Sequence, residues 1–454
     1  MPAVKTFEMI PQKLVFGGAA LGHYNGRAVL VPNALPGEHV EVEPLRETKG
    51  VIHGRLRRVV IPSPARLRPP CPYFGNCGGC SYQHLAAENQ LAWKLAIFRE
   101  TLSRIGKLKW DSEIAVHSAY PWYYRNQARL RVGRAAEGKA EMGFFALESH
   151  RLVKVDACPI LSPRLNATLT ALSEMASRSS FEGVSAIEMM ADDCDRSVML
   201  RLCGRVSPGQ GERLASAVLT ELPQVQTVAF EADGKRRILG EPFLRYRVGD
   251  FTYQISSGSF FQASRFLLPD LVRTVSGMET APADAGCSAP AAKHPNGAEI
   301  ADNYRRKGSS CALDLYAGAG LFTLPLARHF NQVIAVESHS GSAGDLKANV
   351  RASTLGNARA VNQSVFDFLR RFAACAPDFV VLDPPRAGVG YPALKLLARL
   401  RPKSICYVSC HPPTLARDLS FLAQQGYTII SMELFDFFPQ TLHLESVTRL
   451  GTLP

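Results

Sequence analysis

The stretch Cys311-Ala312-Leu313-Asp314-Leu315-Tyr316-Ala317-Gly318-Ala319-Gly320-Leu321-Phe322 decides the fold of the C-terminal part of this chain. Its apolar beginning predicts a buried strand, and Gly318 and Gly320 predict a tight turn after it. The residues 321–330 then predict a helix. A strand, a glycine turn and a helix in this order are typical of an α/β sheet that presents its backbone to an adenosine-type ligand.

The residues that follow favour a particular kind of cofactor. A second apolar strand, 332–336, leads into Glu337, at about the twenty-residue separation where an acid binds ribose hydroxyls. Thr323 stands where the dinucleotide fingerprint has its third glycine. This departure favours S-adenosylmethionine, which has no pyrophosphate, over NAD. An NAD-dependent oxidoreductase is an alternative that rests on the glycine turn alone.

Polar side chains follow two further apolar strands. Asp383 and a Pro-Pro pair come after 379–382, and Cys410 and a second Pro-Pro pair come after 404–409. Both side chains are therefore expected at the same edge of the sheet, where ligands bind in such folds. A lone cysteine is more often a small buried hydrophobe than a nucleophile. Here the run 438–445 adds His443 and Glu445 on one side of an expected strand, so a thiol and a carboxylate base are predicted together.

Composition limits the class of protein. The 454 residues, 46% of them hydrophobic, predict two to four folded domains. No window approaches eighteen apolar residues and no signal peptide begins the sequence, so we expect a cytoplasmic protein that does not enter a membrane. Lys and Arg number 52 against 40 Asp and Glu, a net charge of +12 that favours a polyanionic partner without choosing between RNA, DNA and the ribosome.

Eleven cysteines in such a chain argue for metal binding or thiol chemistry. Cys71, Cys77 and Cys80 lie in a glycine-rich loop that can turn three thiolates toward one metal centre. Cys158, which precedes a proline, is the best candidate for a fourth ligand, with Cys194 and Cys203 as fallback choices. We favour an iron–sulfur cluster over a zinc ribbon, which would usually show two close pairs of cysteines.

The rest of the chain divides into expected domains. Short β-branched runs separated by turn residues predict a small antiparallel barrel over 1–62. Its Arg55, Arg57 and Arg58 could hold single-stranded nucleic acid, or the barrel could simply pack against its neighbour, and composition does not separate the two. A central domain is expected over 63–262, and 144–155 and 224–253 are expected to be strands of one second sheet. Within this domain, the helical pattern 88–105 is expected to pack on the catalytic domain, 263–454. The Ala/Pro-rich residues 277–310 predict a flexible insertion.

Aromatic and basic residues alternate in Trp122-Tyr123-Tyr124-Arg125-Asn126-Gln127-Ala128-Arg129-Leu130-Arg131. Such a segment either offers stacking platforms to unpaired bases or is a strand with one solvated basic face. The segment alone favours neither interpretation.

Together these motifs resemble the RNA (uracil-C5)-methyltransferases. The resemblance rests on Asp314–Leu326, the Asp383 loop, Ser409-Cys410 with its Pro-Pro pair, and Pro439-Gln440-Thr441 followed by His443 and Glu445. Residues 17–31 and 34–38 resemble a TRAM domain, and the four-cysteine set resembles that of the branch acting on large-subunit, 23S, ribosomal RNA. The resemblance implies a Rossmann-like α/β methyltransferase domain, an N-terminal OB-like β-barrel (TRAM) and a central β-rich iron–sulfur domain.

The resemblance also implies roles for single residues. Cys410 would attack carbon 6 of a uracil, and Glu445 would remove the carbon-5 proton after methylation. The residues implied at the S-adenosylmethionine and base pocket are Gln262, Tyr316, Gly318, Gly320, Glu337, Ser364 and Asp383. Cys71, Cys77, Cys80 and Cys158 would hold a [4Fe-4S] cluster. The expected enzyme, of class EC 2.1.1, is a monomer that methylates an unpaired or flipped uridine of 23S ribosomal RNA.

Two alternatives stay open. The substrate could be a transfer RNA instead of 23S ribosomal RNA. A non-catalytic iron–sulfur RNA-binding protein would use the barrel and the cysteine loop without any methyl donor. Binding of S-adenosylmethionine separates this class from the enzymes.

Overall fold

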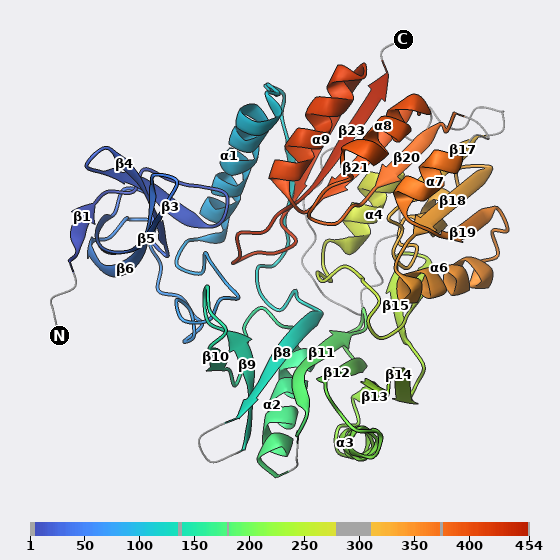
Figure 1. Cartoon of the computed structure of the whole chain (residues 1–454), viewed down its shortest axis with the longest axis horizontal. Helices are drawn as coiled ribbons and strands as arrows, with labels where there is room; N and C mark the ends of the chain where they lie inside the picture. The colour runs from blue at the N-terminus through green and yellow to red at the C-terminus, as the bar shows by residue number, and fades with distance from the viewer. Residues whose placement is uncertain (1–4, 135–138, 179–180, 278–309, 373–375, 453–454) are drawn as a thin grey trace.

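The computed structural model describes residues 5–134, 139–178, 181–277, 310–372 and 376–452 (Figure 1). Apart from its two end residues, the insertion expected at 277–310 lies outside these ranges. Three β-sheet units follow one another in the chain, and a two-stranded hairpin accompanies the last of them. No helix in the described ranges is long and apolar enough to cross a membrane.

The C-terminal unit is built on an eight-stranded sheet. Five neighbouring strands are parallel: β19 (Ala358–Asn362), β18 (Gln332–Glu337), β17 (Cys311–Leu315), β20 (Phe379–Leu382) and β21 (Ser404–Ser409). β23 (Glu445–Thr452) runs antiparallel between β21 and β22 (Tyr427–Phe435), and β7 (Ala115–His117) closes the far edge. The predicted α/β sheet is confirmed, and Asp383 and Cys410 follow neighbouring strands as expected.

Both faces of this sheet are buried. Along β20, Phe379 and Val381 belong to one hydrophobic core and Val380 and Leu382 to the other, as expected for a parallel sheet with apolar strands. The helices of this unit are α4 (Leu268–Ser276), α5 (Thr323–Leu326), α6 (Ser340–Ala352), α7 (Val365–Arg371), α8 (Tyr391–Arg399) and α9 (Pro412–Gln424). The helix expected over 321–330 is therefore short; single hydrogen-bonded turns continue it from Ala327 to Phe330.

A helix from before the central sheet also covers this unit. α1 (Ala87–Gly106) confirms the helix predicted at 88–105, and its Phe98 and Leu102 share a core with Leu415 and Ala416 of α9. Figure 1 shows α1 beside α9, between the N-terminal unit and the C-terminal sheet. This helix, expected to pack on the catalytic domain, thus shares its apolar face with the C-terminal unit.

The central unit is a seven-stranded sheet in the order β10-β9-β8-β11-β12-β13-β14. Its strands are β8 (Gln127–Arg134), β9 (Ala140–Phe145), β10 (Leu152–Lys154), β11 (Val184–Ala191), β12 (Val198–Gly204), β13 (Val225–Ala232) and β14 (Lys235–Gly240), with helices α2 (Pro163–Arg178) and α3 (Pro208–Glu221). One prediction is wrong: β15 (Leu244–Val248) and β16 (Phe251–Ile255) form a separate hairpin. Their inward side chains pack with α4 and the C-terminal sheet in one hydrophobic core.

The N-terminal unit is a curled sheet of six strands in the order β1-β5-β6-β4-β3-β2. They are β1 (Phe7–Met9), β2 (Lys13–Leu14), β3 (Ala19–Tyr24), β4 (Arg27–Pro32), β5 (His39–Thr48) and β6 (Val51–Ile61). The expected antiparallel pairing holds except between β4 and β6, which are parallel. Curling brings the chain after β1 onto β3, where a Cβ on Gly22 would lie 3.0 Å from the Ile10 carbonyl oxygen.

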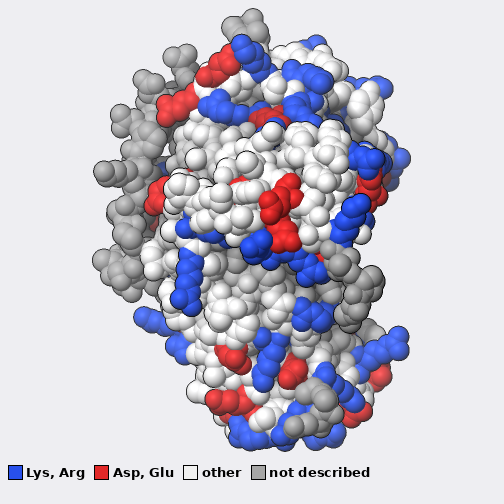
Figure 2. All heavy atoms as spheres, turned by 90° about the vertical axis from the view of Figure 1, so that its left-hand side faces the viewer, with Lys and Arg blue, Asp and Glu red and all other residues white. Residues whose placement is uncertain are grey.

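Basic and acidic side chains are interspersed on the N-terminal unit. Figure 2 shows the side of the molecule on which the N-terminal unit lies. Lys and Arg side chains are spread from the top to the bottom of this side, and Asp and Glu side chains lie between them. The three arginines expected to meet nucleic acid pair with carboxylates: Arg55 and Arg57 with Glu43, and Arg58 with Glu41. All three arginine side chains are more than 40% exposed, and such surface ion pairs are weak, so the arginines stay available to a stronger anion.

Candidate active site

Three neighbouring strands bring the predicted catalytic groups to one edge of the C-terminal sheet. Asp383 follows β20 and Cys410 follows β21. β23 pairs antiparallel with β21 so that Ser446 lies opposite Ser409, and Glu445 therefore lies opposite Cys410. The run 438–445, expected as a strand, is instead a turn-rich loop that ends at Glu445. The buried hydrogen bonds to this loop and the positive φ of Gln440, 68°, are incompatible with a regular strand.

The three side chains share a desolvated environment. Burial, followed by the nearby carboxyl groups of Glu445 and Asp383, raises the pKa of the Cys410 thiol to about 11, while Arg386 opposes this shift. Burial and Asp383 raise the pKa of Glu445 well above its ordinary range. Burial and Asp314 raise the pKa of Asp383 to about 7, against a hydrogen bond from Gln262. Clustered carboxyl groups with raised pKa values are typical of acid–base sites.

The glycine turn after β17 lies beside these groups. Tyr316 and Gly318 have φ values of 66° and 56°, so the chain turns sharply where β17 ends. The Gly318 amide donates to Glu337 Oε2 at 2.9 Å, and Glu337 Oε1 accepts from the His339 amide at 2.6 Å. The carboxylate predicted to bind ribose thus stands at the turn. It keeps lone pairs for further donors, because a carboxylate offers about four acceptor positions.

Comparisons with known proteins agree with this geometry. Residues 299–452 match the family described as tRNA (Uracil-5-)-methyltransferase. A 23S rRNA (uracil(1939)-C(5))-methyltransferase RlmD of Alkalilimnicola ehrlichii is 31% identical over 97% of this chain and 95% of that protein. The RlmD of Pectobacterium atrosepticum is 30% identical over 95% of this chain and 90% of that protein. The chain belongs to the RNA (uracil-C5)-methyltransferase family.

A solved structure supports the fold of this methyltransferase along its length. The Pyrococcus abyssi tRNA (uracil-54, C5)-methyltransferase in complex with S-adenosyl-L-homocysteine superposes with a TM-score of 0.71. It covers 98% of this chain and 100% of its own, at 23% identity, which shows a shared fold. As a family member, the chain is an S-adenosylmethionine-dependent enzyme that methylates carbon 5 of uracil in RNA.

The residues around the glycine turn of the methyltransferase fit a polar adenosine ligand. The loop 256–262 lies over the turn, where a Cβ on Gly318 would be 3.9 Å from the Phe260 carbonyl oxygen. Ser259 Oγ is buried there without a hydrogen-bond partner among the residues described. Gln127 donates its side-chain amide to the Phe261 carbonyl at 3.0 Å, which fixes the loop before Gln262.

Two implied cofactor residues already have structural partners. The Ser364 hydroxyl caps α7, accepting from the Asp367 amide at 3.0 Å. The Tyr316 hydroxyl lies 3.5 Å from the Val389 carbonyl oxygen, and burial raises the pKa of its phenol to about 12. Neither contact prevents the side chain from also binding the cofactor, but each contact gives the side chain a structural role that needs no ligand.

Two residues at the edge, Arg386 and His411, were not singled out from the sequence. Arg386, in the Asp383 loop, is the cation that faces Cys410 and Glu445, and it lies 3.4 Å from His443 Nδ1. His411 follows Cys410, and its ring contacts Phe16 of the N-terminal unit edge-on, with centroids 5.1 Å apart. Arg386 could have been suspected from its place after Asp383-Pro384-Pro385, whereas the contact with Phe16 depends on domain packing.

The segment 122–131 is mainly structural. Tyr124 is 1% exposed and its hydroxyl donates to the Pro439 carbonyl, so it cannot stack on a base. Asn126 is buried and donates to the Tyr246 hydroxyl at 2.8 Å. Arg129 pairs with Glu188, and Arg131 lies over the Phe145 ring. Only the half-exposed Tyr123 and Trp122 in this segment keep aromatic surface for a nucleic acid.

The four predicted cluster ligands line one cavity of about 210 Å³. Cys71, Cys77 and Cys80 come from the loop before α1, and Cys158 comes from the turn after β10. Asn166 fixes this turn by accepting from the Cys158 amide and donating to its carbonyl. The fallback residues Cys194 and Cys203 do not line this cavity.

The donor set at this cavity is four thiols, the ligands that an iron–sulfur cluster would use. Among the residues described, no three His, Cys, Asp or Glu side chains are grouped to hold one metal ion. A zinc ion would need its sulfur ligands about 2.3 Å away, whereas each cysteine of an iron–sulfur cluster binds a different iron. Burial raises the pKa of Cys80 to about 12, and the other three thiols add to this shift.

Proposed function

We propose that this enzyme methylates carbon 5 of a uridine in 23S ribosomal RNA through a covalent adduct between Cys410 and carbon 6. The observation that carries the mechanism is that Cys410, directly after β21, lies beside Glu445, the first residue of the neighbouring β23, and beside Asp383. The two RlmD relatives, which match almost end to end, support the choice of 23S ribosomal RNA. The tRNA enzyme of similar fold keeps transfer RNA as the alternative.

The chemistry requires a nucleophile and a base on the same ring. The Cys410 thiolate forms a bond to carbon 6, and the electron pair of the 5,6 double bond moves toward the carbon-4 oxygen, which makes carbon 5 nucleophilic. Bound S-adenosylmethionine would supply the electrophilic methyl group: carbon 5 takes the methyl as its bond to sulfur breaks, and S-adenosylhomocysteine is the leaving group. Glu445 then accepts the carbon-5 proton, the 5,6 double bond re-forms, and the Cys410 thiolate leaves.

The other residues hold the reactants in this scheme. Gln262 and Asp383 hydrogen-bond the edge of the uracil, and the protonated Asp383 favoured by its pKa of about 7 can donate to a carbonyl oxygen. Glu337 and the backbone at Gly318 and Gly320 hold the adenosine part of the methyl donor, with Tyr316 and Ser364 at its margin. The uridine must be unpaired or flipped, since a stacked base cannot reach a thiol at a sheet edge.

We propose further that residues 1–62 act as a TRAM-like barrel that binds RNA, and that Cys71, Cys77, Cys80 and Cys158 of the central domain hold a [4Fe-4S] cluster. A single chain carries every group named for the reaction, so we propose that it works as a monomer. These assignments are supported by the curled N-terminal sheet and by the cavity that the four thiols share.

The mechanism is tested with RNA that contains 5-fluorouridine, whose fluorine cannot leave as the proton does. The wild-type enzyme should form a denaturation-stable adduct with such RNA, and Cys410→Ala should form none. Cys406→Ala is the matched control, because Cys406 lies on the same strand but is fully buried. Methyl transfer at the wild-type rate by Cys410→Ala would refute the covalent mechanism, and transfer to tRNA but not to 23S fragments would refute the proposed substrate.

A further inference from the structure

The position of Glu445 depends on the loop before it. Residues 436–444 join β22 to β23, and Glu445 is the first residue of β23, paired with Phe435. The Oε1 atom of Glu445 is buried and has no hydrogen-bond partner among the described residues. Because this side-chain oxygen is not anchored, the backbone at the end of the loop has to set where the carboxylate points.

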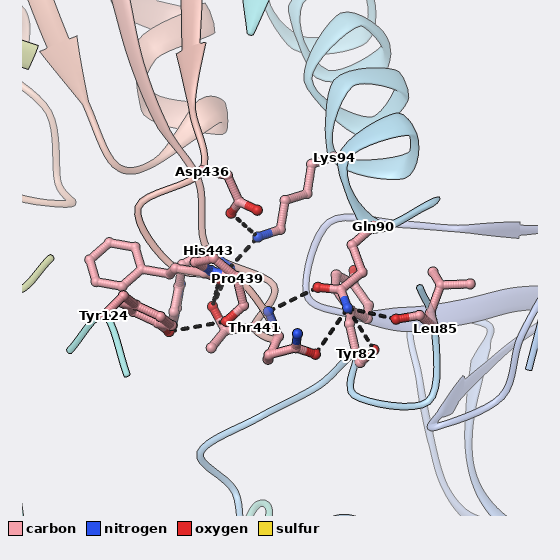
Figure 3. A network of polar contacts seen from close by, with 11 residues as sticks. Tyr82, Leu85, Gln90, Lys94, Tyr124, Asp436, Pro439, Thr441 and His443 are labelled. Carbon is pink, nitrogen blue, oxygen red and sulfur yellow. Dashed lines mark hydrogen bonds and ion pairs between the residues drawn. The ribbon is translucent and has the colours of Figure 1, made fainter. Parts of the chain in front are cut away.

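Elements outside the C-terminal sheet clamp this loop at successive residues (Figure 3). Lys94 of α1 pairs with Asp436 at 2.6 Å and donates to the Phe438 carbonyl at 3.0 Å. Both members of the pair are buried, at 1% and 4% side-chain exposure. The Tyr124 hydroxyl, from just before β8, donates to the Pro439 carbonyl at 3.0 Å.

Gln440 is held most completely. Its amide donates to Gln90 Oε1 at 2.9 Å, and its side-chain oxygen accepts from Gln90 Nε2 at 3.0 Å. Its carbonyl accepts from the amides of Ser81 and Tyr82, both at 2.9 Å. These contacts stabilise a left-handed conformation, φ 68°, that glutamine rarely adopts. Gln90 donates in addition to the carbonyls of Tyr82 and Leu85, so one buried amide ties three segments together.

We propose that Gln90 and Lys94 of α1 are positioning residues that act through the 436–444 loop to place the Glu445 carboxylate for removal of the carbon-5 proton. The inference rests on the proposed function. It assigns these residues to the elimination step alone, because the contacts reach the loop that leads into Glu445 and none of them reaches Cys410 or the glycine turn. Loss of the clamp should therefore leave thiol attack and methyl transfer intact and slow the release of product.

The test separates these steps by using two RNA substrates. Adduct formation with 5-fluorouridine RNA reports attack and methyl transfer, and turnover on uridine RNA also requires the base. Gln440→Gly removes the side-chain pair with Gln90 and suits the positive φ. Lys94→Met removes the buried cation at nearly constant length. In both variants, adduct formation should stay within about twofold of wild type, whereas turnover should fall by about tenfold to 100-fold, as expected for a misplaced catalytic group.

A methylated adduct on ordinary uridine RNA should accumulate in these variants, because its proton is not removed. Gln90→Glu should have the same effect as these two variants. Its carboxylate oxygen would replace the Gln90 amide nitrogen and would repel the oxygen atoms to which that nitrogen now donates. Arg99→Met is the matched control: Arg99 lies on the same helix and donates to the Trp110 and Ser112 carbonyls, away from the loop. Thr101→Val is a second control, because Thr101 is a buried residue of α1 whose hydroxyl donates to the Ile97 carbonyl of the same helix.

Three outcomes decide the matter. A selective loss of turnover with adduct accumulation supports the positioning role. Equal losses of adduct formation and turnover, or no loss in either, overturn it and leave the proposed function standing. A wild-type enzyme that forms no adduct would overturn the proposed function itself. Melting temperatures of all variants, compared with those of Arg99→Met and Thr101→Val, show whether a loss follows from unfolding.

Discussion

Asp314 carries a carboxyl group into the interior of the C-terminal sheet, directly below the glycine turn. It is 0% exposed, and its Oδ2 accepts from the Thr323 hydroxyl at 2.6 Å. Burial raises the pKa of Asp314 to about 7, and the charge of Glu337 adds to the shift against the Thr323 hydrogen bond. Thr323, which replaces a glycine of the dinucleotide fingerprint, therefore has a physical role as the partner of this carboxyl group.

The raised pKa makes stability depend on pH with a definite sign. The folded chain keeps a proton on Asp314 up to about pH 7, and the unfolded chain releases it near pH 4, so its stability contribution is lost as pH rises through this window. Asp314→Asn removes the titration and keeps an acceptor for Thr323. Its stability gain over wild type should grow from pH 5 to pH 8, to at most about 4 kcal/mol. Thermal melts at several pH values measure the gain. Asp111→Asn, at an exposed carboxylate, is the control. A gain that is constant with pH would contradict the assignment.

At the scale of single residues, the sequence was most informative where a residue follows a strand. Asp383, Cys410 and Glu337 could be placed because parallel strands end at a common edge, whatever the rest of the fold does. Arg386 and His443 lie at the same edge, but their meeting at 3.4 Å depends on how two loops pack. Loop packing leaves no periodic signal in a sequence, so this contact could not be predicted.

The cysteine loop requires glycine at Gly78 but not at the neighbouring Gly79. A Cβ on Gly78 would lie 3.2 Å from both the Leu147 Cα and the Phe145 carbonyl oxygen, which are backbone atoms that cannot turn away. The Gly78 amide donates to that same carbonyl at 2.9 Å. A Cβ on Gly79 would meet only Cys77 Sγ, at an ordinary contact distance of 3.6 Å.

Gly78→Ala should therefore push the loop from the central sheet and separate Cys77 and Cys80 from Cys158. We expect anaerobically purified Gly78→Ala to retain less than about half of the wild-type iron and sulfide, since metal retention depends on a preformed ligand set. Visible absorbance and iron analysis measure this, and Gly79→Ala serves as the matched control. Wild-type iron content in Gly78→Ala would exclude a tight fit of the loop as the reason for the glycine.

Helices and strands were predicted well where one period of hydrophobic residues persists. The pattern at 88–105 gave a helix within one residue at each end, and 379–382 gave a strand. The hairpin β15–β16 was assigned to the wrong sheet because alternation tells which side of a strand is apolar but not which core receives it. The run 438–445 was expected to be a strand because the hydrogen bonds and the ion pair that hold this loop come from residues more than 300 positions earlier.

The three units are joined by side chains that cross between them. Leu442, in the loop that leads to Glu445, packs against the core of the N-terminal unit, and a Cβ on Gly18 would lie 3.2 Å from the Leu442 Cβ. Phe16 touches His411 beside Cys410. The N-terminal unit is thus a wall of the candidate active site, an arrangement that the separate domain patterns in the sequence did not reveal.

Removing the Leu442 side chain should loosen this junction. We expect Leu442→Ala to lower the free energy of unfolding by about 1–3 kcal/mol, below the usual range for a fully buried leucine because Leu442 is only partly buried. The N-terminal unit should become more sensitive to limited proteolysis. Leu45→Ala, at a leucine that is 50% exposed on β5, is the control. Equal protease sensitivity of Leu442→Ala and wild type would show that the units associate without this contact.

The place of β23 has a consequence for how the chain acquires its structure during synthesis. β23 follows β21 and β22 in the chain but lies between them, and β7, made some 300 residues earlier than β22, pairs at the outer edge. Neither neighbour of β23 can complete its backbone hydrogen bonds until residues 445–452 have been made. Such long-range pairing is slow and leaves strand edges exposed meanwhile. A nascent chain that stalls before Glu445 would therefore contain the Cys410 thiol but lack β23, so the edges of β21 and β22 would be unpaired. We expect chaperones to bind these exposed strand edges.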